Sequence, residues 1–125
     1  MSSTPLTPNR DPYQNEPMWS KSEKAFDRTA FDATLKGELH QVMKEAKQKA
    51  HQIKEPADLW ELEHYLTDRR KEIDSKYDYR YSRLTHVFGR LLYEGRVSEE
   101  DLRGLPEDKL KSIRSLADLF AKYAD

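Results

Sequence analysis

The sequence predicts an all-α protein: two long antiparallel helices plus a small C-terminal helical head, dimerising through the long helices. Charged residues make up 36% of the 125 residues and hydrophobic residues another 36%, whereas globular domains average about 25% and about 45–50%. Long solvated helices suit this composition better than a sphere with a thick core. Apolar residues also recur at three- and four-residue spacing over most of the chain, which is the period of an amphipathic helix.

The overall counts exclude several classes of protein. The 22 basic and 23 acidic residues give a net charge of −1, without the basic excess expected of a nucleic-acid-binding protein. The absence of cysteine excludes disulfides, thiolate metal ligands and a cysteine nucleophile. No apolar run approaches the roughly 20 residues that span a bilayer, and the N-terminus lacks signal-peptide features. We therefore expect a cytoplasmic protein with no membrane or nucleic-acid partner.

Residues 1–18 differ in composition from the rest of the chain. They hold four of the six prolines, interspersed with Ser, Thr and Asn. Such a segment buries too little apolar surface to offset its ordering entropy, so we predict a disordered tail. Residues 19–125 are expected to form a single all-helical domain.

The first long helix is predicted to run from Ser20 to about residue 54. Ser20 and Glu23 match the S-x-x-E capping box, in which two side chains satisfy backbone N–H groups of the first turn. Gly37 weakens the helix slightly, and Pro56 ends it. Its apolar stripe consists of Phe31, Leu35, Leu39, Val42, Ala46, Ala50 and Ile53.

The second helix is predicted to start at Asp58 and to continue to a C-cap at Gly95. Residues 76–81 alternate with period two, but apolar three- and four-residue spacing continues on both sides, so helix is expected there. At about 37 residues and roughly 55 Å, this helix would extend beyond a monomer whose radius of gyration is near 14 Å. A second copy of the chain would cover its apolar seam. The candidate dimer-interface residues are Leu35, Leu39, Leu59, Leu66, Arg70, Ile73 and Tyr77.

The C-terminal quarter is predicted to form the head. Ser98 and Asp101 start a short helix, and Gly104 and Pro106 mark a turn before the last helix. That helix is expected to fold back against Val87, Leu91 and Leu92.

One flank of the second helix combines an aromatic residue with alternating charges, as protein-binding hot spots do. It holds Trp60, Glu63, Thr67, Arg70, Asp74 and Tyr81. The alternative interpretation is that Trp60 belongs to the core and that Arg70 forms a simple i,i+4 pair with Asp74.

Enzyme and cofactor signatures are weak. Glu61 and His64 match the Glu-x-x-His half-motif of di-iron carboxylate proteins, but such a site needs a second motif that only dimerisation could supply. The glycines form no phosphate loop, and no catalytic triad is indicated. We expect no catalysis, no cofactor and no metal; a metal protein made by dimerisation stays a minor alternative.

A long run of residues in the second helix resembles the fluorescence recovery protein family of cyanobacteria, with weaker similarity over most of residues 19–117. The resembling residues are Asp58, Leu59, Trp60, Leu62, Tyr65, Leu66, Arg70, Glu72, Ile73, Asp74, Lys76, Tyr77, Asp78, Arg80, Phe88, Leu91, Leu92, Glu94 and Gly95. The resemblance implies an all-α homodimer. Members of the family bind the photoactivated form of the orange carotenoid protein, through the C-terminal domain of that protein, and speed its return to the resting form. They also help detach it from the phycobilisome.

The resemblance further implies a functional patch of Trp, His, Asp and Arg on the second helix. Trp60 and Arg70 match it, whereas Glu63 stands at the His position and His64 at the Asp position. His86 stands where the family has an aromatic residue in the head. We expect Trp60 to anchor a partner, Arg70 to contact a carboxylate or the second protomer, and Glu63 and His64 to set specificity.

The two substitutions keep a second hypothesis open. Charge changes at a matched interface can exclude the original partner, so the protein could be a divergent helical dimer that binds a related or different partner, without a role in photoprotection. A purely scaffolding helical dimer is a further alternative.

Overall fold

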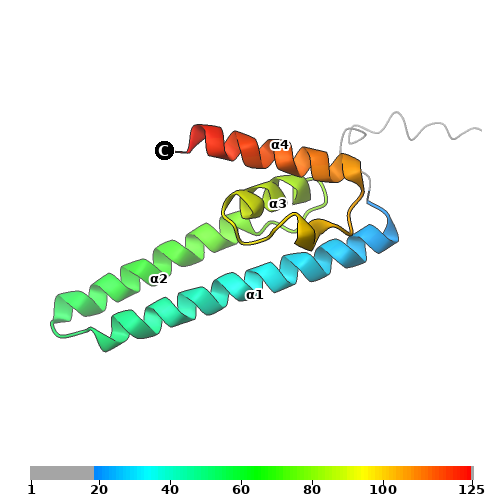
Figure 1. Cartoon of the computed structure of the whole chain (residues 1–125). Coiled ribbons are helices and arrows are strands. Elements are labelled where there is room, and N and C mark those ends of the chain that lie inside the picture. Colours follow the sequence, from blue (N-terminus) through cyan, green and yellow to red (C-terminus); the bar gives the residue numbers. More distant parts are fainter. Residues whose placement is uncertain (1–18, 125) are drawn as a thin grey trace, which may run out of the picture.

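The computed structural model describes residues 19–124, which contain four α-helices, one 3₁₀ turn and no strand. Helices α1 (Lys21–His51) and α2 (Pro56–Lys76) form a long antiparallel hairpin. Helices α3 (Leu84–Tyr93) and α4 (Glu107–Tyr123) pack side by side as the head at the open end of this hairpin (Figure 1). The predicted all-helical class is confirmed. The predicted disordered tail, residues 1–18, lies outside the described residues.

Local signals fix the start of each arm of the hairpin. The Glu23 amide donates to the Ser20 hydroxyl at 3.2 Å, and the Ser20 amide donates to the Glu23 carboxylate at 3.3 Å. This is the predicted capping box. Helix α1 ends at His51, and Pro56 is the first residue of α2. The Asp58 carboxylate accepts from the amides of residues 54 and 55 at 3.0 and 3.1 Å.

The prediction of one continuous helix from residue 58 to Gly95 is wrong. Helix α2 ends at Lys76, a non-helical segment covers residues 77–83 (the linker), and α3 begins at Leu84. The alternation over residues 76–81 was the correct signal. Side chains of Tyr77 and Tyr79 both turn onto α1, where their rings meet Phe31 edge-to-face at 5.4 and 4.8 Å between centroids.

The C-terminal end of α3 follows the predicted glycine signal. Gly95 has φ +75°, a conformation that favours glycine. Its amide donates to the Leu92 carbonyl and the next amide, of Arg96, donates to the Leu91 carbonyl. This pairing is the Schellman motif, which satisfies carbonyls left free at a helix end.

The core lies in the head and at the head's contact with the first half of α1. Reciprocal bonds between Ser98 and Asp101 start the 3₁₀ turn Glu100–Leu102, as predicted. Gly89 lets α4 approach α3 closely, since a Cβ there would lie 2.7 Å from Cβ of Leu116. The buried apolar cluster contains Trp19, Phe31, Leu84, Val87, Phe88, Leu91, Val97, Leu102, Leu105, Leu110 and Ile113.

The far half of the hairpin has no core of its own. Between Leu39 and Glu72 no residue is buried, although several large apolar side chains lie there. Because these residues are not buried, the hairpin arms project from the head as a largely solvated pair (Figure 1).

No helix among residues 19–124 combines the length and apolarity that a bilayer crossing requires.

Candidate functional site: a protein-binding surface on the hairpin

Trp60 is exposed on the second turn of α2. Its side chain is 61% accessible, the highest value among the tryptophan and leucine side chains that remain exposed. The interpretation of Trp60 as a core residue is therefore wrong for the single chain. An exposed indole on a helix without a core of its own is typical of a residue that becomes buried on association.

Arg70 lies on the same side of α2 as Trp60. At about 100° per residue, the two positions are separated by about 80° around the helix. The Arg70 Nε lies 3.7 Å from an Asp74 oxygen, and both side chains are mostly exposed, at 85% and 72%. Such a surface pair contributes little to stability. The guanidinium thus remains available to a partner's carboxylate.

Glu63 and His64 differ in how they share this surface. Glu63 lies between Trp60 and Arg70 around the helix, and its carboxylate accepts a bond from the Thr67 hydroxyl at 3.2 Å. His64 is exposed too, but it is rotated about 40° beyond Trp60. The structure therefore brings Trp60, Glu63 and Arg70 onto one face and leaves His64 at its edge.

Two aromatic or imidazole side chains grouped with this site lie elsewhere. Tyr81 belongs to the linker, so its prediction as part of the α2 flank is wrong; its backbone carbonyl accepts from the Trp19 indole at 3.1 Å. His86 is on α3, where it lines a mostly apolar cavity of about 560 Å³ with Tyr93 and Phe120. Burial and the nearby Arg83 lower the pKa of His86.

The candidate dimer residues fall into two groups. Four of them line one cleft of about 420 Å³ between α1 and α2, namely Leu39, Leu66, Arg70 and Ile73. Leu59 is exposed nearby on α2. Leu35 and Tyr77 instead pack partly against the core of their own chain. A second copy could reach the exposed members of the first group, which are Leu39, Leu59, Leu66 and Arg70, whereas Ile73 is buried within its own chain.

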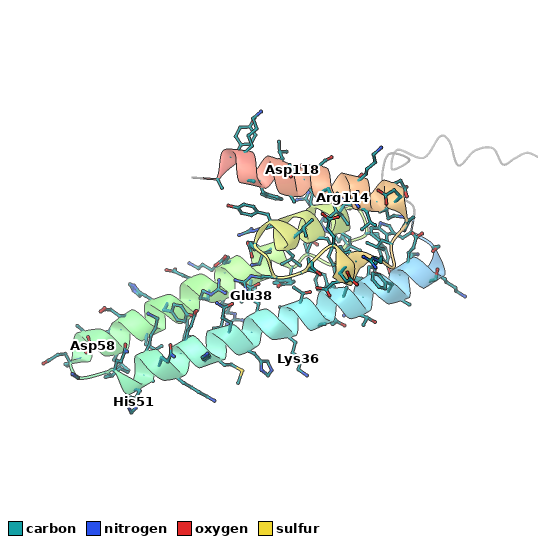
Figure 2. The ribbon with its side chains drawn as sticks, viewed as in Figure 1. Lys36, Glu38, His51, Asp58, Arg114 and Asp118 are labelled. Carbon is teal, nitrogen blue, oxygen red and sulfur yellow. The ribbon has the colours of Figure 1, made fainter. Side chains whose placement is uncertain are left out.

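A buried ionic cluster joins the hairpin to the head, and the sequence-based interpretation did not identify it. The Glu38 carboxylate, on α1, accepts from Lys76 Nζ, from Arg69 Nη2 and from the Tyr77 hydroxyl, each at 2.8 Å. Lys76 Nζ also donates to Glu94 at 2.8 Å. Side chains of Glu38 and Lys76 are fully buried. Figure 2 shows Glu38 between the two arms, near the head.

The head supplies the other charges of this cluster. Arg96 Nε lies 2.8 Å from Glu94 and 3.2 Å from Glu38, and its Nη1 donates to Gln41 at 2.8 Å. Burial alone would raise the pKa of Glu94, but hydrogen bonds from Lys76 and two arginines outweigh it and lower the pKa to about 2. The same balance lowers the pKa of Glu38. Both carboxylates are therefore ionised at neutral pH.

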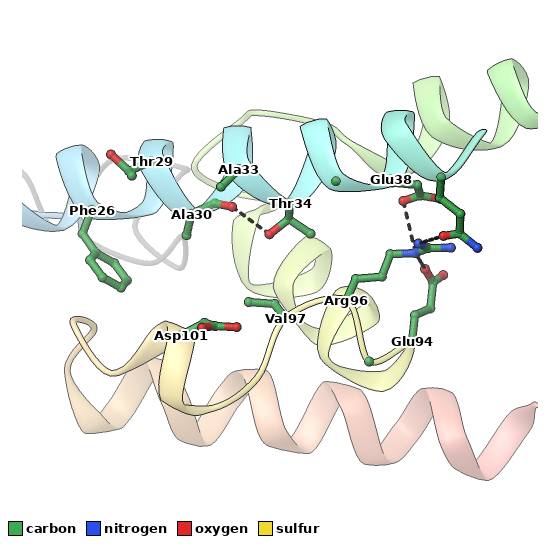
Figure 3. A pocket seen from close by; sticks show the side chains of 13 residues that line it. Phe26, Thr29, Ala30, Ala33, Thr34, Glu38, Glu94, Arg96, Val97 and Asp101 are labelled. Atoms are coloured by element: carbon green, nitrogen blue, oxygen red, sulfur yellow. Dashed lines mark hydrogen bonds and ion pairs between the residues drawn. The ribbon is translucent and has the colours of Figure 1, made fainter. Parts of the chain in front are cut away.

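This cluster closes one end of a groove of about 700 Å³ between α1 and residues 94–101 (Figure 3). Small side chains of α1, including Ala30 and Ala33, form its wall, and Arg96 reaches across to Glu38 at the charged end. A spacing signal could have found the cluster. Glu38 follows Leu35 by three residues, on the apolar stripe of its helix, and Lys76 follows Ile73 in the same way.

The Glu-x-x-His pattern has no further ligands near it. Glu61 and His64 are both exposed on α2. Within residues 19–124, no group of three or more His, Asp or Glu side chains is placed to hold a metal ion. The di-iron alternative needs a second motif from another copy of the chain, so it stays a prediction.

Comparisons with known proteins agree with this geometry. Residues 19–117 match the family model described as photoprotection regulator fluorescence recovery protein. The fluorescence recovery protein of a Synechocystis strain is 38% identical over 104 residues, which cover 83% of this chain and 95% of that protein. Solved structures of the Fremyella diplosiphon and Synechocystis proteins each superpose with a TM-score of 0.78, at 38% identity, over 81% of this chain and 99% of theirs. The chain belongs to the fluorescence recovery protein family, whose described role is the regulation of photoprotection.

Proposed function

We propose that this protein is a non-catalytic regulator that binds the photoactivated orange carotenoid protein and accelerates its return to the resting form. Binding to the C-terminal domain of that partner, and its release from the phycobilisome, belong to the same proposal. The exposed Trp60, with the exposed Arg70 about 15 Å further along the same side of α2, is the observation that carries it. A regulator of this kind needs no chemistry of its own, because tighter binding to one conformation shifts the partner's equilibrium.

The face of α2 formed by Trp60, Glu63 and Arg70 has the composition of a protein-binding hot spot. A large aromatic side chain supplies apolar area, while Arg70 and Glu63 can orient a partner through charge-assisted bonds. The intramolecular contacts of these charged side chains are few and exposed, so little is lost when a partner replaces them.

A homodimer formed through the hairpins is part of the proposal. The apolar side chains of Leu39, Met43, Leu59 and Leu66 remain 40–53% exposed along arms that have no core of their own. Charge distribution favours a second copy as the cover. The end of the first arm is basic, with lysines at 44, 47, 49 and 54, and the start of the second is acidic, with carboxylates at 55, 58, 61 and 63. A two-fold arrangement can set each basic stretch against the partner's acidic one.

The proposal is tested by mixing the purified protein with photoactivated orange carotenoid protein and following the red-to-orange absorbance change in the dark. We expect clear acceleration, and we expect Trp60→Ala to abolish it while helicity and oligomeric state stay unchanged. Asp32→Asn is the matched control, since Asp32 is exposed in the half of α1 that lies near the head, whereas Trp60 lies near the tip of the hairpin. Global unfolding of Trp60→Ala, or equal loss in Asp32→Asn, would contradict the assigned role of Trp60.

A divergent partner is the second candidate function. The observation that favours it is the pair Glu63 and His64, an acidic and an imidazole side chain where the resemblance places His and Asp. The double variant Glu63→His/His64→Asp discriminates between the two. If the natural chain fails to accelerate recovery and the double variant succeeds, the fold has been retained for another protein, without a role in photoprotection. The cytoplasmic location expected from the sequence stays a prediction.

A further inference from the structure

The linker between α2 and α3 ends a helix without any local stop signal. Residues 76–88 contain no glycine or proline, and the C-cap residue of α2, Tyr77, has an ordinary negative φ of −91°. The end of α3 is different, because Gly95 and its Schellman bonds stop the helix locally. Helix α2 therefore stops because of contacts made elsewhere in the molecule.

Those contacts run from the linker to α1. The Tyr77 hydroxyl donates to Glu38 at 2.8 Å and the Tyr79 hydroxyl donates to Asp27 at 2.7 Å. Phe31 lies between the two tyrosine rings and meets both edge-to-face. The alternating tyrosines thus fasten an extended segment along three turns of α1, in place of the helical hydrogen bonds that residues 77–83 would otherwise make.

The burial of Asp27 adds a free-energy cost to this conformation of the linker. Asp27 is fully buried, its Oδ2 has no hydrogen-bond partner in the described part of the chain, and burial raises the pKa of this carboxyl. A half-satisfied buried carboxylate costs free energy that an exposed one does not. The linker state is thus favoured by the tyrosine contacts and opposed by the burial of Asp27.

The same residues also suit a helix. Ile73, Tyr77, Leu84 and Phe88 are spaced by four, seven and four residues, which keeps them on one side of a continuous helix. Asp78 and Arg80 pair with each other, and the Arg80 side chain is 69% exposed. Neither residue type excludes a helix.

We propose that residues 77–83 are a conformational latch with two states. In one state Tyr77 and Tyr79 hold the linker on α1 through their bonds to Glu38 and Asp27. In the other the linker becomes helical and joins α2 and α3 into one helix over residues 56–93. The head then moves away from α1 while α3 and α4 stay packed on each other. This inference does not depend on the identity of any partner.

The latch is tested with spin labels on the full chain. It has no cysteine, so Lys36→Cys on α1 and Asp118→Cys on α4, both exposed and both marked in Figure 2, define one hairpin-to-head distance. Dilution with unlabelled chain suppresses distances between copies. We expect one short distance in the parent, and an added longer distance in Tyr77→Phe/Tyr79→Phe, which keeps both rings but removes both hydroxyls. Tyr81→Phe is the control and should match the parent.

A second pair of variants separates helix joining from simple loosening. Added to the double phenylalanine variant, Asp78→Ala/Arg80→Ala should increase the long-distance population and the ellipticity at 222 nm. Asp78→Gly/Arg80→Gly should decrease both, with up to about a 20-fold difference in the ratio of the two states, because glycine disfavours a helix interior. Equal long-distance populations in the two variants, or a single distance in all of them, would overturn the proposal.

A third readout covers a variant that does not fold. Trp19 is buried against the linker and donates to the Tyr81 carbonyl, and with Trp60→Phe it is the only tryptophan left of two. If the double phenylalanine variant unfolds, the alanine and glycine pairs are compared with natural tyrosines at 77 and 79. Red-shifted Trp19 emission is then expected for the alanine pair relative to the glycine pair, and the reverse order refutes the latch.

Discussion

Replacing Glu38 by Gln tests whether the buried ionic cluster holds the head to the hairpin. Glu38 accepts three bonds of 2.8 Å from Lys76, Arg69 and Tyr77, and its side chain is fully buried. Removing one partner from a buried ion pair costs about 3–5 kcal/mol. The lower end applies here, because glutamine keeps one acceptor oxygen and Lys76 keeps its bond to Glu94. We expect a loss of about 3 kcal/mol.

That loss is measured by urea unfolding followed at 222 nm, and by thermal unfolding. At about 4 °C per kcal/mol for a domain of this size, the Tm should fall by roughly 12 °C. Asp32→Asn is the matched control on the same helix. Asp32 pairs with Arg28 at 3.1 Å, but both side chains are more than half exposed, so its loss should cost at most about 0.5 kcal/mol.

The reasoning is refuted if Glu38→Gln changes the free energy of unfolding by less than about 1 kcal/mol, or if it stabilises the protein. Either outcome would show that desolvation of Glu38 and Lys76 cancels their attraction. A loss as large in Asp32→Asn would also refute it, since burial would then make no difference.

The remaining predictions concern the pH dependence of stability and the effects of two glycine substitutions. The folded-state pKa of Glu94 is about 2, against an ordinary value of 4.5. Between these pH values the unfolded state binds more protons than the folded state, so protonation favours unfolding. The stabilisation from Glu94 is complete above about pH 5 and is lost as the pH falls toward 2, by up to about 3 kcal/mol. Urea midpoints from pH 7 to pH 2 check this, and Glu94→Gln should flatten the slope; an unchanged slope contradicts the assignment. Gly37→Ala should stabilise the protein by about 0.5–1 kcal/mol, because a Cβ at this helical position meets nothing within 4 Å. Gly89→Ala should destabilise it by about 1–3 kcal/mol through its clash with Leu116, and equal effects of the two substitutions in thermal unfolding would contradict both.

The sequence predicted the helix ends and turns that are formed by residues close together in the chain. The capping box at Ser20, the glycine end of α3 at Gly95 and the Ser98–Asp101 start of the 3₁₀ turn all hold in the structure. Helical periodicity also predicted that the last helix folds back on α3. The capping box, the glycine end and the start of the 3₁₀ turn need only neighbours within a few residues, which is why the sequence contains them.

The linker and the ionic cluster depend on contacts between distant residues. Tyr79 bonds to Asp27, 52 positions away, and Lys76 bonds to Glu38, 38 positions away. Period-two and period-four signals coexist over residues 76–81, and only the surface of α1 decides between them. Exposure of Trp60 was undecided for the same reason, since an apolar position on a helix does not reveal whether its own chain covers it.

The contact between the two ends of the described chain has a consequence for biosynthesis. Lys109 donates to Glu23, 86 residues earlier, and its ammonium lies over the Trp19 ring at 4.5 Å. On the ribosome, the α1–α2 hairpin emerges first, but the start of α1 stays uncovered until α4 has been made. At about 5–20 residues per second, that interval lasts a few seconds. During it Trp19 lacks the cover that Lys109 gives it, so a message truncated before codon 109 yields a chain in which the start of α1 remains open.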